Sequence, residues 1–293
     1  MHLKLTAADK TDKGRQREQN EDSPYKRIET SEDGDRGLFI VADGMGGYQA
    51  GEVASRLAIE TISKALDGFF KPIVDQPTMR LDPIKPDATS DETMILPAKP
   101  NDPHKTHKLA ESQVLRFNKQ QFIQAVQEAN TAILRYGEKK AGARGLGSTV
   151  TAVLIENDRA YIANVGDSRT YLLRDGKLAP ITTDHSLVAK LVETKQITPE
   201  EIYTHPQRNL IYRSLGAGHK TVEVDVFHET LRPGDTLLLC SDGLWEMVKM
   251  SDIRTQLMKV GSPQKVCDTL IDLANANGGE DNITAVVVHV SAI

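Results

Sequence analysis

The alternation of apolar and polar positions along the chain predicts many short strands. Residues 2–9 alternate apolar and polar side chains, which is the period of a strand with one buried face. A polar stretch then reaches to Asp35, and the apolar run 38–42 predicts a buried strand. Hairpin turns are expected at Asn157-Asp158 and Asp175-Gly176. Further strands are expected at 148–156, 159–165, 169–174, 177–181, 222–228, 235–240 and 283–290.

Apolar residues at helical spacing predict a smaller number of helices between these strands. A glycine-rich turn at 43–51 leads into a helix that carries apolar residues from Ala54 to Leu66 on one face and ends near Gly68. A second helix is expected over about 112–137. Shorter helices are expected near 187–194, after Pro199, near 251–259 and over 263–276.

The order of these elements favours a mixed α+β domain. Strands and helices do not alternate strictly, so a doubly wound parallel sheet is disfavoured. Antiparallel sheets packed on each other, with helices outside, fit the order better. A chain of 293 residues suits one large domain or two small ones, and it contains no internal repeat. We expect a single domain over residues 1–293.

Residues 71–108 interrupt the pattern. Seven of the chain's 13 prolines lie in this stretch, which has almost no periodicity. We therefore expect a long exposed loop inserted into the domain. A tolerated surface insertion explains such a loop more simply than a docking site for a partner, which stays open as an alternative.

Composition and charge narrow the class of protein. Hydrophobic residues make up 39% and charged residues 26% of the chain, and the net charge of −5 argues against a nucleic-acid partner. The first residues form no signal-peptide core, and no apolar run approaches the roughly 18 residues of a membrane span. Cys240 and Cys267 are interpreted as small core residues rather than as a disulfide. We expect a soluble cytoplasmic protein without a membrane partner.

Acidic turns are the main chemical feature of the chain. Asp43 follows the apolar run 38–42, Asp242 follows the strand 235–240, and Asp281 precedes the strand 283–290. If the strand ends converge, their carboxylates repel by roughly 4 kcal/mol per pair at about 4 Å. Such a cluster persists when some members are protonated or when cations lie between them. Because oxygen ligands suit Mg²⁺ or Mn²⁺, the turns predict a hard-metal site and metal-assisted chemistry.

Eight short motifs follow one another along the chain at a characteristic spacing. They are Arg17-x-x-Asn20-Glu21-Asp22, Val41-Ala42-Asp43-Gly44-Met45-Gly46-Gly47, Gly147-Ser148-Thr149, Asn164-Val165-Gly166-Asp167-Ser168-Arg169, Thr183-Asp184-His185, Arg213-Ser214-Leu215-Gly216, Cys240-Ser241-Asp242-Gly243-Leu244 and Asp281-Asn282. In this order they resemble the metal-dependent serine/threonine phosphatases of the PP2C (PPM) family, in its bacterial branch. The resemblance runs from about residue 3 to 290 and leaves 71–108 outside. It implies an αββα sandwich, with two antiparallel sheets between layers of helices.

The resemblance also implies a binuclear Mn²⁺ or Mg²⁺ centre at one end of the sandwich. Asp43 would bridge the two ions, and the Gly44 carbonyl would bind one of them. Glu21 or Asp22 would help, directly or through water. Because adjacent residues on an extended chain point to opposite sides, we expect one of this pair to bind the metal and the other to support it. The motif does not say which.

The second ion and the surroundings of the centre follow from the same resemblance. Asp242 and Asp281 would bind that ion, and Asp167 would reach a third, weaker metal. An exposed loop carboxylate remains the alternative for Asp167. Residues 186–215 would form the family's mobile flap beside the site.

The resemblance places catalysis on Arg17, Asp43 and Asp242. A guanidinium offers a planar fork that matches two phosphate oxygens, so Arg17 is the expected phosphate clamp, with a solvated loop arginine as the alternative. Two cations would activate a water for in-line attack on phosphorus, and no protein nucleophile is needed. Met45 stands where some eukaryotic relatives carry a histidine. The acid for the leaving group therefore stays open, with His185 or a water as candidates.

We therefore expect a phosphatase that acts on phosphoserine and phosphothreonine in proteins. The implied partners are phosphorylated proteins and a cognate serine/threonine kinase, and the expected state is a monomer. One alternative is a metal-dependent phosphodiesterase or nuclease, which the net negative charge disfavours. Another is a catalytically silent, phosphopeptide-binding regulator. Such a regulator would typically lack one metal aspartate, whereas Asp43, Asp242 and Asp281 are all present.

Overall fold

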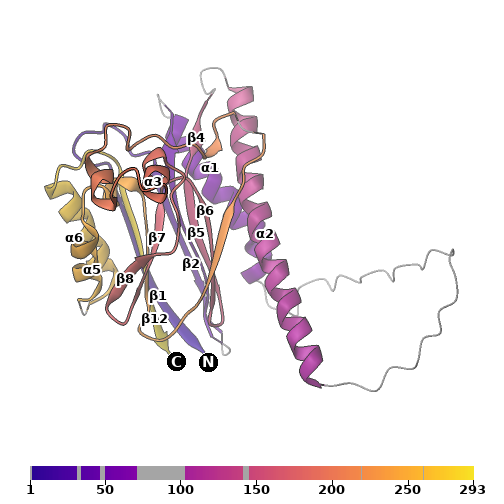
Figure 1. Ribbon diagram of the computed structural model, residues 1–293. Coiled ribbons are helices and arrows are strands. Elements are labelled where there is room, and N and C mark those ends of the chain that lie inside the picture. Colours follow the sequence, from indigo (N-terminus) through magenta and orange to yellow (C-terminus); the bar gives the residue numbers. More distant parts are fainter. Residues whose placement is uncertain are drawn as a thin grey trace.

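Two β-sheets packed face to face, with helices on both outer sides, make up the body of the protein (Figure 1). The computed structural model describes residues 2–31, 34–46, 50–70, 103–140, 145–218, 220–259 and 261–293, and over 103–118 it describes the backbone alone. The strands pair antiparallel throughout these residues. This arrangement confirms the expected α+β class and the αββα sandwich.

The first sheet joins the two ends of the chain. Its strands lie in the order β1 (Leu3–Asp12), β12 (Ile283–Ala292), β11 (Thr236–Cys240), β7 (Arg169–Arg174) and β8 (Lys177–Pro180). The register between β1 and β12 runs from Leu3 opposite Ala292 to Asp12 opposite Ile283. The loop after Asp12 is thereby brought beside the start of β12, where Asp281 lies.

The second sheet carries several of the motif residues named in the sequence analysis. Its order is β10 (Asp225–Thr230), β6 (Arg159–Val165), β5 (Val150–Glu156), β3 (Arg36–Met45), β4 (Gly147–Ser148) and β9 (Leu215–Gly216), with β2 (Asp22–Glu29) also paired to β3. Asp22 lies opposite Asp43 in the β2–β3 register. Two acidic residues from separate motifs are thus neighbours across the sheet.

Three apolar layers hold the sandwich together. Phe39, Val153, Leu239 and Val286 belong to the layer between the two sheets. A second layer lies beneath α1 (Ala50–Ala65), η1 (Asp67–Phe70) and α2 (Pro103–Lys139), and a third beneath α5 (Met250–Leu257) and α6 (Pro263–Ala276). Both faces of each sheet are buried, and for this reason the sequences of the central strands are continuous apolar runs rather than alternating patterns.

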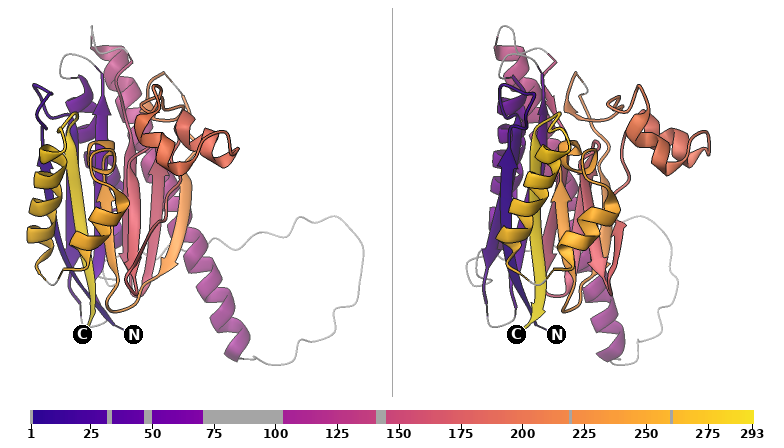
Figure 2. Two further views of the ribbon diagram at one scale, coloured as in Figure 1. Left: turned by 60° about the vertical axis from the view of Figure 1, so that its left-hand side comes forward. Right: turned by 90° about the vertical axis from the view of Figure 1, so that its left-hand side faces the viewer.

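Further short helices lie near one end of the sandwich. α3 (Leu187–Glu193) and η3 (Pro199–Thr204) project from one end of the sandwich, the end at which β3, β6 and β11 finish (Figure 2). α4 (Asp242–Trp245) is a single turn directly after β11. The segment expected to form a flap therefore lies beside the acidic strand ends.

Some of the predicted element bounds were wrong. The polar stretch before Asp35 contains β2, which the pattern missed because this strand is only half buried. The strand expected at 148–156 is divided into β4 and β5, and the strand expected at 222–228 begins later, at Asp225. Asp43 lies within β3 rather than after it, since β3 continues to Met45.

The bounds of the expected loop at 71–108 need a correction as well. α2 begins at Pro103, so the last six residues of that range are helical. A proline at the first position of a helix costs nothing, because its missing N–H would have no partner there. Residues 71–102 lie outside the described part of the chain.

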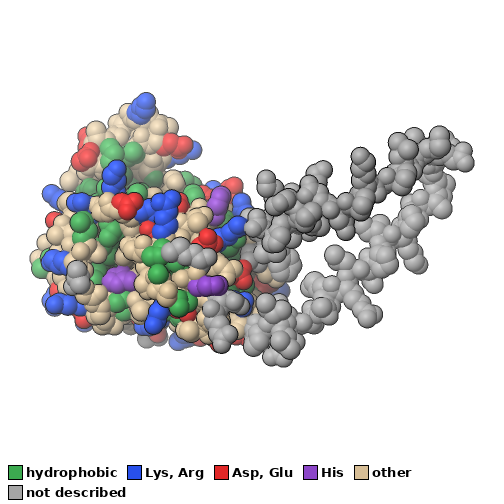
Figure 3. Space-filling model, turned by 90° about the horizontal axis from the view of Figure 1, so that it is seen from below, with side chains coloured by type: hydrophobic (Ala, Val, Ile, Leu, Met, Phe, Trp, Pro, Cys, Tyr) green, Lys and Arg blue, Asp and Glu red, His purple; other side chains and the backbone are tan. Residues whose placement is uncertain are grey.

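Two further expectations concern surfaces and cysteines. Cys240 and Cys267 are both buried and free, as expected for core residues. In the described ranges no helix is both long and apolar enough to cross a membrane. On the face that carries the chain termini, the described residues mix acidic, basic and apolar side chains (Figure 3).

Candidate active site

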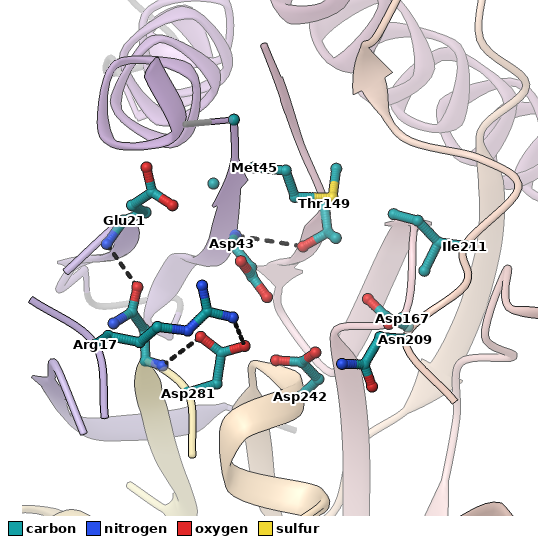
Figure 4. A pocket seen from close by; sticks show the side chains of 13 residues that line it. Arg17, Glu21, Asp43, Met45, Thr149, Asp167, Asn209, Ile211, Asp242 and Asp281 are labelled. Carbon is teal, nitrogen blue, oxygen red and sulfur yellow. Dashed lines mark hydrogen bonds and ion pairs between the residues drawn. The ribbon is translucent and has the colours of Figure 1, made fainter. Parts of the chain in front are cut away.

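A pocket of about 320 Å³ opens at the end of the sandwich where the acidic turns meet (Figure 4). Five carboxylates line it, and they come from five separate segments: Glu21, Asp43, Asp167, Asp242 and Asp281. Their side chains face a common space in Figure 4. The strand ends that the sequence placed far apart thus converge, because the antiparallel register brings them to one edge of both sheets.

Asp43 is held at the back of the pocket by the neighbouring strand. Its carbonyl accepts hydrogen bonds from the Thr149 N–H at 2.8 Å and from the Ser148 hydroxyl at 3.0 Å. Its own N–H donates to Thr149 Oγ1 at 3.3 Å. The Gly-Ser-Thr motif therefore fixes the main chain of Asp43 and leaves the carboxylate free to face the pocket.

Gly44 and Gly51 allow the start of α1 to approach β3 closely. A Cβ atom on Gly44 would lie 2.6 Å from the Glu21 carbonyl oxygen and closer still to that of Gly51. A Cβ atom on Gly51 would lie 2.6 Å from the carboxyl carbon of Glu21. Sequence reasoning singled out Gly44 and missed Gly51, for which the glycine-rich turn was the only signal.

The structure separates Glu21 from Asp22. Glu21 lines the pocket, whereas Asp22 is buried behind it. The Asp22 Oδ2 atom accepts a hydrogen bond from the Ser241 hydroxyl at 2.7 Å, and its Oδ1 atom has no hydrogen-bond partner. Burial, the largest cause, and the charge of Asp281 raise the pKa of Asp22 to about 6.

Asp242 and Asp167 form the opposite wall. Asp242 is the first residue of α4, and its Oδ1 atom is buried without a hydrogen-bond partner. Asp167 lies in the turn between β6 and β7 and is 5% exposed, so it is not the exposed loop carboxylate that was the alternative. Burial and the nearby Asp184 raise the pKa of Asp167 to about 7.

The carboxylates also raise one another's pKa values. Burial is the largest cause for Asp43 and for Asp242, whose pKa values are both raised well above the usual range. The next cause is the charge of Asp22 for Asp43, and that of Asp167 for Asp242. A pocket of this kind favours protons or cations, since either relieves the repulsion.

The donor set fits a hard divalent cation. All five pocket carboxylates supply oxygen ligands, and the unpartnered Oδ1 atom of Asp242 leaves a buried acceptor available. Among the described residues, no histidine or cysteine lines the pocket, so they do not support a zinc-type site there. Across the described ranges, no group of three or more acidic, histidine or cysteine side chains is already gathered as a metal cluster. The pocket carboxylates surround the space without converging on a single point, an arrangement that the mutual repulsion of like charges favours.

Arg17 lies at the edge of the pocket. Its side chain is half exposed, and its Nη2 atom lies 2.6 Å from Oδ2 of Asp281 (Figure 4). The expected phosphate clamp is thus beside the acids, paired with one of them. The pairing was not foreseen from the sequence.

Asn282 connects the segments at this edge of the pocket through side-chain hydrogen bonds. Its side-chain amide donates to the Lys13 carbonyl at 3.0 Å and to the Gln19 carbonyl at 2.8 Å. Its Oδ1 atom accepts from the Glu21 N–H at 2.8 Å. One side chain next to Asp281 therefore fixes the loop that carries Arg17 and Glu21.

The flap segment supplies pocket residues that the sequence did not indicate. Asn209 and Ile211 line the pocket. Arg208 holds them in place, with its guanidinium 3.0 Å from Glu246 and 2.8 Å from Glu280. Nothing in the local pattern of 205–212 distinguishes these residues from an ordinary polar loop.

Two residues bear on the question of the leaving-group acid: His185, which is a candidate, and Met45, which stands where some eukaryotic relatives carry a histidine. Met45 lines the pocket. His185 does not line it and is buried beneath the flap. There the His185 Nδ1 atom accepts from the Gly166 N–H at 2.9 Å. Burial, as the largest cause, lowers the pKa of His185. This arrangement supports a structural role for His185.

Comparison with known proteins identifies the family. The family described as "Protein phosphatase 2C" matches residues 14–276. The serine/threonine phosphatase stp of Listeria welshimeri is 36% identical over 280 residues, which cover 96% of this chain and 94% of that protein. The chain belongs to the protein phosphatase 2C family. The resemblance drawn from the eight motifs is thereby confirmed.

Solved structures agree with this assignment. The crystal structure of the Mycobacterium tuberculosis serine/threonine phosphatase PstP/Ppp matches with a TM-score of 0.73 at 35% identity, covering 98% of this chain and 99% of that chain. The catalytic domain of PstP, solved in complex with two manganese ions, matches with a TM-score of 0.72 at 34% identity, covering 99% and 100%. The expected sandwich is therefore the fold of solved members of this family.

Proposed function

We propose that this chain is a protein serine/threonine phosphatase that hydrolyses phosphoserine and phosphothreonine with the help of two divalent cations, Mn²⁺ or Mg²⁺. The observation that carries the proposal is the pocket in which five carboxylates from distant segments meet beside an arginine. Family membership and the two manganese ions bound by a relative support it.

Asp43 is the residue we assign between the two cations. It lies centrally, and its pKa responds to the charges of Asp22, Asp242, Asp167 and Asp281. The carbonyl of Gly44 and the carboxylate of Glu21 would hold the first cation, because both border the pocket near the start of α1. Asp22 supports Asp43 from behind, since it is buried and bonded to Ser241.

Asp242 and Asp281 would hold the second cation in this proposal. Both line the pocket, and the charge of Asp281 is one of the causes that raise the pKa of Asp242. Asp167 would hold a third, weaker cation on the side of Asp242. Its burial and its raised pKa of about 7 make it a group that responds to a nearby positive charge.

Bound divalent cations would supply an activated water and would withdraw charge from the phosphoryl oxygens. Arg17 reaches the pocket from its edge, and its guanidinium leaves Asp281 to bind two phosphate oxygens. Asn209 and Ile211 close one side of the pocket and limit the access of bulk water.

The described hydroxyl groups near the pocket are engaged in structural bonds. Ser148 donates to the Asp43 carbonyl, Ser241 donates to Asp22, and the hydroxyls of Thr149 and Ser168 lie 2.7 Å apart. A protein nucleophile is therefore not required, and water attacks phosphorus directly.

The proposal extends to partners. A phosphatase for phosphoserine and phosphothreonine needs a kinase to make its substrate, so phosphorylated proteins and a serine/threonine kinase are the partners we propose. We propose further that the chain acts as a monomer in the cytoplasm, without nucleic acid.

The test is hydrolysis of p-nitrophenyl phosphate and of a phosphothreonine peptide. We expect activity with Mn²⁺, none with EDTA, and none for Asp43→Asn. Asp175→Asn is the matched control, because this aspartate lies in the β7–β8 turn with a φ of 51°, which asparagine tolerates. That variant should retain full activity.

Other results of these assays would reject a part of the proposal or favour one of the two alternative functions. Turnover that resists the chelator would reject the metal-assisted mechanism, and full turnover by Asp43→Asn would reject its bridging role. Cleavage of bis-p-nitrophenyl phosphate faster than the monoester would favour the phosphodiesterase. Phosphopeptide binding without any turnover would favour the silent regulator.

A further inference from the structure

The chain's one tryptophan, Trp245, lies directly behind the acid-lined pocket. It is the last residue of α4, so a single helical turn separates its indole from Asp242, the first residue. The side chain is 1% exposed, and its Nε1–H donates to the main-chain carbonyl of Asp167 at 3.0 Å. A buried indole N–H needs an acceptor, and here the acceptor belongs to a residue that lines the pocket.

The indole is held on its other sides by a buried ion pair and a flap residue. The guanidinium carbon of Arg169 lies 3.5 Å from the ring centroid of Trp245. Arg169 itself is fixed by Asp184, with Nε–Oδ1 and Nη2–Oδ2 distances of 2.9 and 2.6 Å, and by the Tyr171 hydroxyl at 3.0 Å. Tyr203 of η3 packs edge-on against the indole at 6.5 Å. The ring therefore cannot turn without breaking these contacts.

The turn that carries Asp167 depends on such distant contacts for its shape. Gly166 has a φ of +109° and is bonded to His185 through both its N–H and its carbonyl. Ser168 is bonded to Thr149. Trp245 supplies the bond to the carbonyl of Asp167 itself. Asp242 and Asp167 are thus connected through one helical turn, the indole of Trp245 and a single hydrogen bond.

We propose that Trp245 is a positioning residue that sets the separation of Asp167 and Asp242, and with it the affinity of the pocket for the third, weaker cation that Asp167 would hold beside Asp242. The inference rests on the proposed function in taking the pocket to bind divalent cations. Small hard cations accept little deviation from their preferred geometry. Substituting a residue that orients a metal ligand from behind typically lowers metal affinity by about 10- to 100-fold.

The test is Mn²⁺ binding by the whole chain, measured from the electron paramagnetic resonance signal of free Mn²⁺. Trp245→Phe keeps a ring against Arg169 but removes the N–H. We expect its weakest Mn²⁺ site to lose about tenfold in affinity while the tighter sites are unchanged. Asp167→Asn identifies that site, because it should remove the same one.

Ile253→Val is the matched control for a merely structural role. Ile253 is a fully buried member of the same apolar cluster as Trp245 but has no bond to Asp167. It should lower the unfolding temperature without changing any Mn²⁺ affinity. Trp245→Phe binding Mn²⁺ like the wild type, or losing affinity equally at every site, would overturn the inference.

A second measurement covers the case in which Trp245→Phe does not fold. With one tryptophan in the chain, the emission of the wild type reports this ring alone. Mn²⁺ should quench it in a late phase that is absent from Asp167→Asn. Identical quenching curves for the two proteins would reject the inference.

The experiments distinguish failure of the Trp245 inference from failure of the proposed phosphatase function. Normal Mn²⁺ binding without phosphopeptide hydrolysis would reject the phosphatase and leave the role of Trp245 standing. Mn²⁺-dependent hydrolysis with unchanged binding by Trp245→Phe would reject the positioning role alone. A wild-type chain that binds no Mn²⁺ would overturn both.

Discussion

The guanidinium of Arg17 lies 2.6 Å from the carboxylate of Asp281, a residue 264 positions further along the chain. The pairing of β1 with β12 brings the two loops together. In this arrangement one residue expected to bind phosphate and one expected to bind a cation neutralise each other at the rim of the pocket. We expect Arg17 to leave this pair when a phosphate enters the pocket.

Removal of the Arg17 guanidinium tests this relationship. Arg17→Ala should lower kcat/KM for a phosphothreonine peptide by about 10- to 100-fold, because it removes charge-assisted bonds to phosphate. Arg17→Lys should recover only part of the loss, since an ammonium group lacks the planar fork. Steady-state kinetics at several Mn²⁺ concentrations measures both variants. Arg15→Ala is the control, and an equal loss in that exposed neighbour would contradict a specific role for Arg17.

Gly51→Ala should reverse the usual effect of alanine in a helix. Alanine normally stabilises a helix by about 1 kcal/mol relative to glycine. Here the new methyl group would collide with the carboxyl group of Glu21 and the carbonyl carbon of Gly44. We expect a loss of about 1–3 kcal/mol in the free energy of unfolding, together with reduced Mn²⁺-dependent activity.

Gly68→Ala provides the matched comparison for Gly51→Ala. A Cβ atom at Gly68 would meet nothing within 4 Å. Denaturant unfolding of both variants is the measurement. If Gly51→Ala proves as stable as Gly68→Ala, the close approach of α1 to Glu21 is not required.

The pH dependence of stability should change sign when cations bind. Burial raises the pKa of Asp22 to about 6 and that of Asp167 to about 7, from the ordinary value of 3.8. A carboxyl group with a raised folded-state pKa stabilises the fold fully below its unfolded-state pKa, and this stability is lost as the pH rises through the folded-state pKa. The chelator-treated protein should therefore unfold at a temperature a few degrees lower at about pH 8 than at about pH 6.5.

Excess Mn²⁺ should reverse that order, because cation binding requires the ionised carboxylates. Burial lowers the pKa values of His185 and His289 from their ordinary 6.5, so these two groups act in the opposite direction and reduce the difference between the two pH values. Calorimetric scans with and without Mn²⁺ at both pH values provide the measurement. A metal-free protein that is more stable at the higher pH would contradict the raised pKa values.

Asp235 offers a stability change that should leave catalysis intact. Its carboxylate is 2% exposed and accepts bonds from Arg174 at 2.9 and 2.7 Å and from the Arg232 N–H at 2.8 Å. Asp235→Ala should cost about 2 kcal/mol, because it leaves these donors without their acceptor. Activity per folded molecule should not change, since Asp235 does not line the pocket.

The neighbouring Glu229 serves as the control for Asp235. It lies 3.8 Å from Arg174 and is one-third exposed, so Glu229→Gln should have almost no effect. Urea unfolding monitored by circular dichroism compares the two variants. A similar loss in both would mean that the buried bonds of Asp235 contribute nothing specific.

The sequence predicted much of the site because strong local patterns mark it. The apolar runs that became β3, β11 and β12 end or begin at aspartates, and an aspartate at the end of a buried strand lies at the rim of a core. Tertiary structure decided what local pattern does not encode. Glu21 and not Asp22 faces the pocket, and the half-buried strand β2 was missed because its pattern is too weak.

By itself, the sequence determined the class of fold, the family and the set of acidic residues. Periodicity is a property of neighbouring positions, and the order of the motifs can be seen along the chain without knowing how it folds. Only the tertiary structure decided that Arg17 pairs with Asp281, that Gly51 packs on Glu21, and that Trp245 bonds to Asp167. Each of these contacts joins segments that strand register and helix packing bring together. Their partners are chosen by long-range pairing of strands, and no short stretch of sequence records that choice.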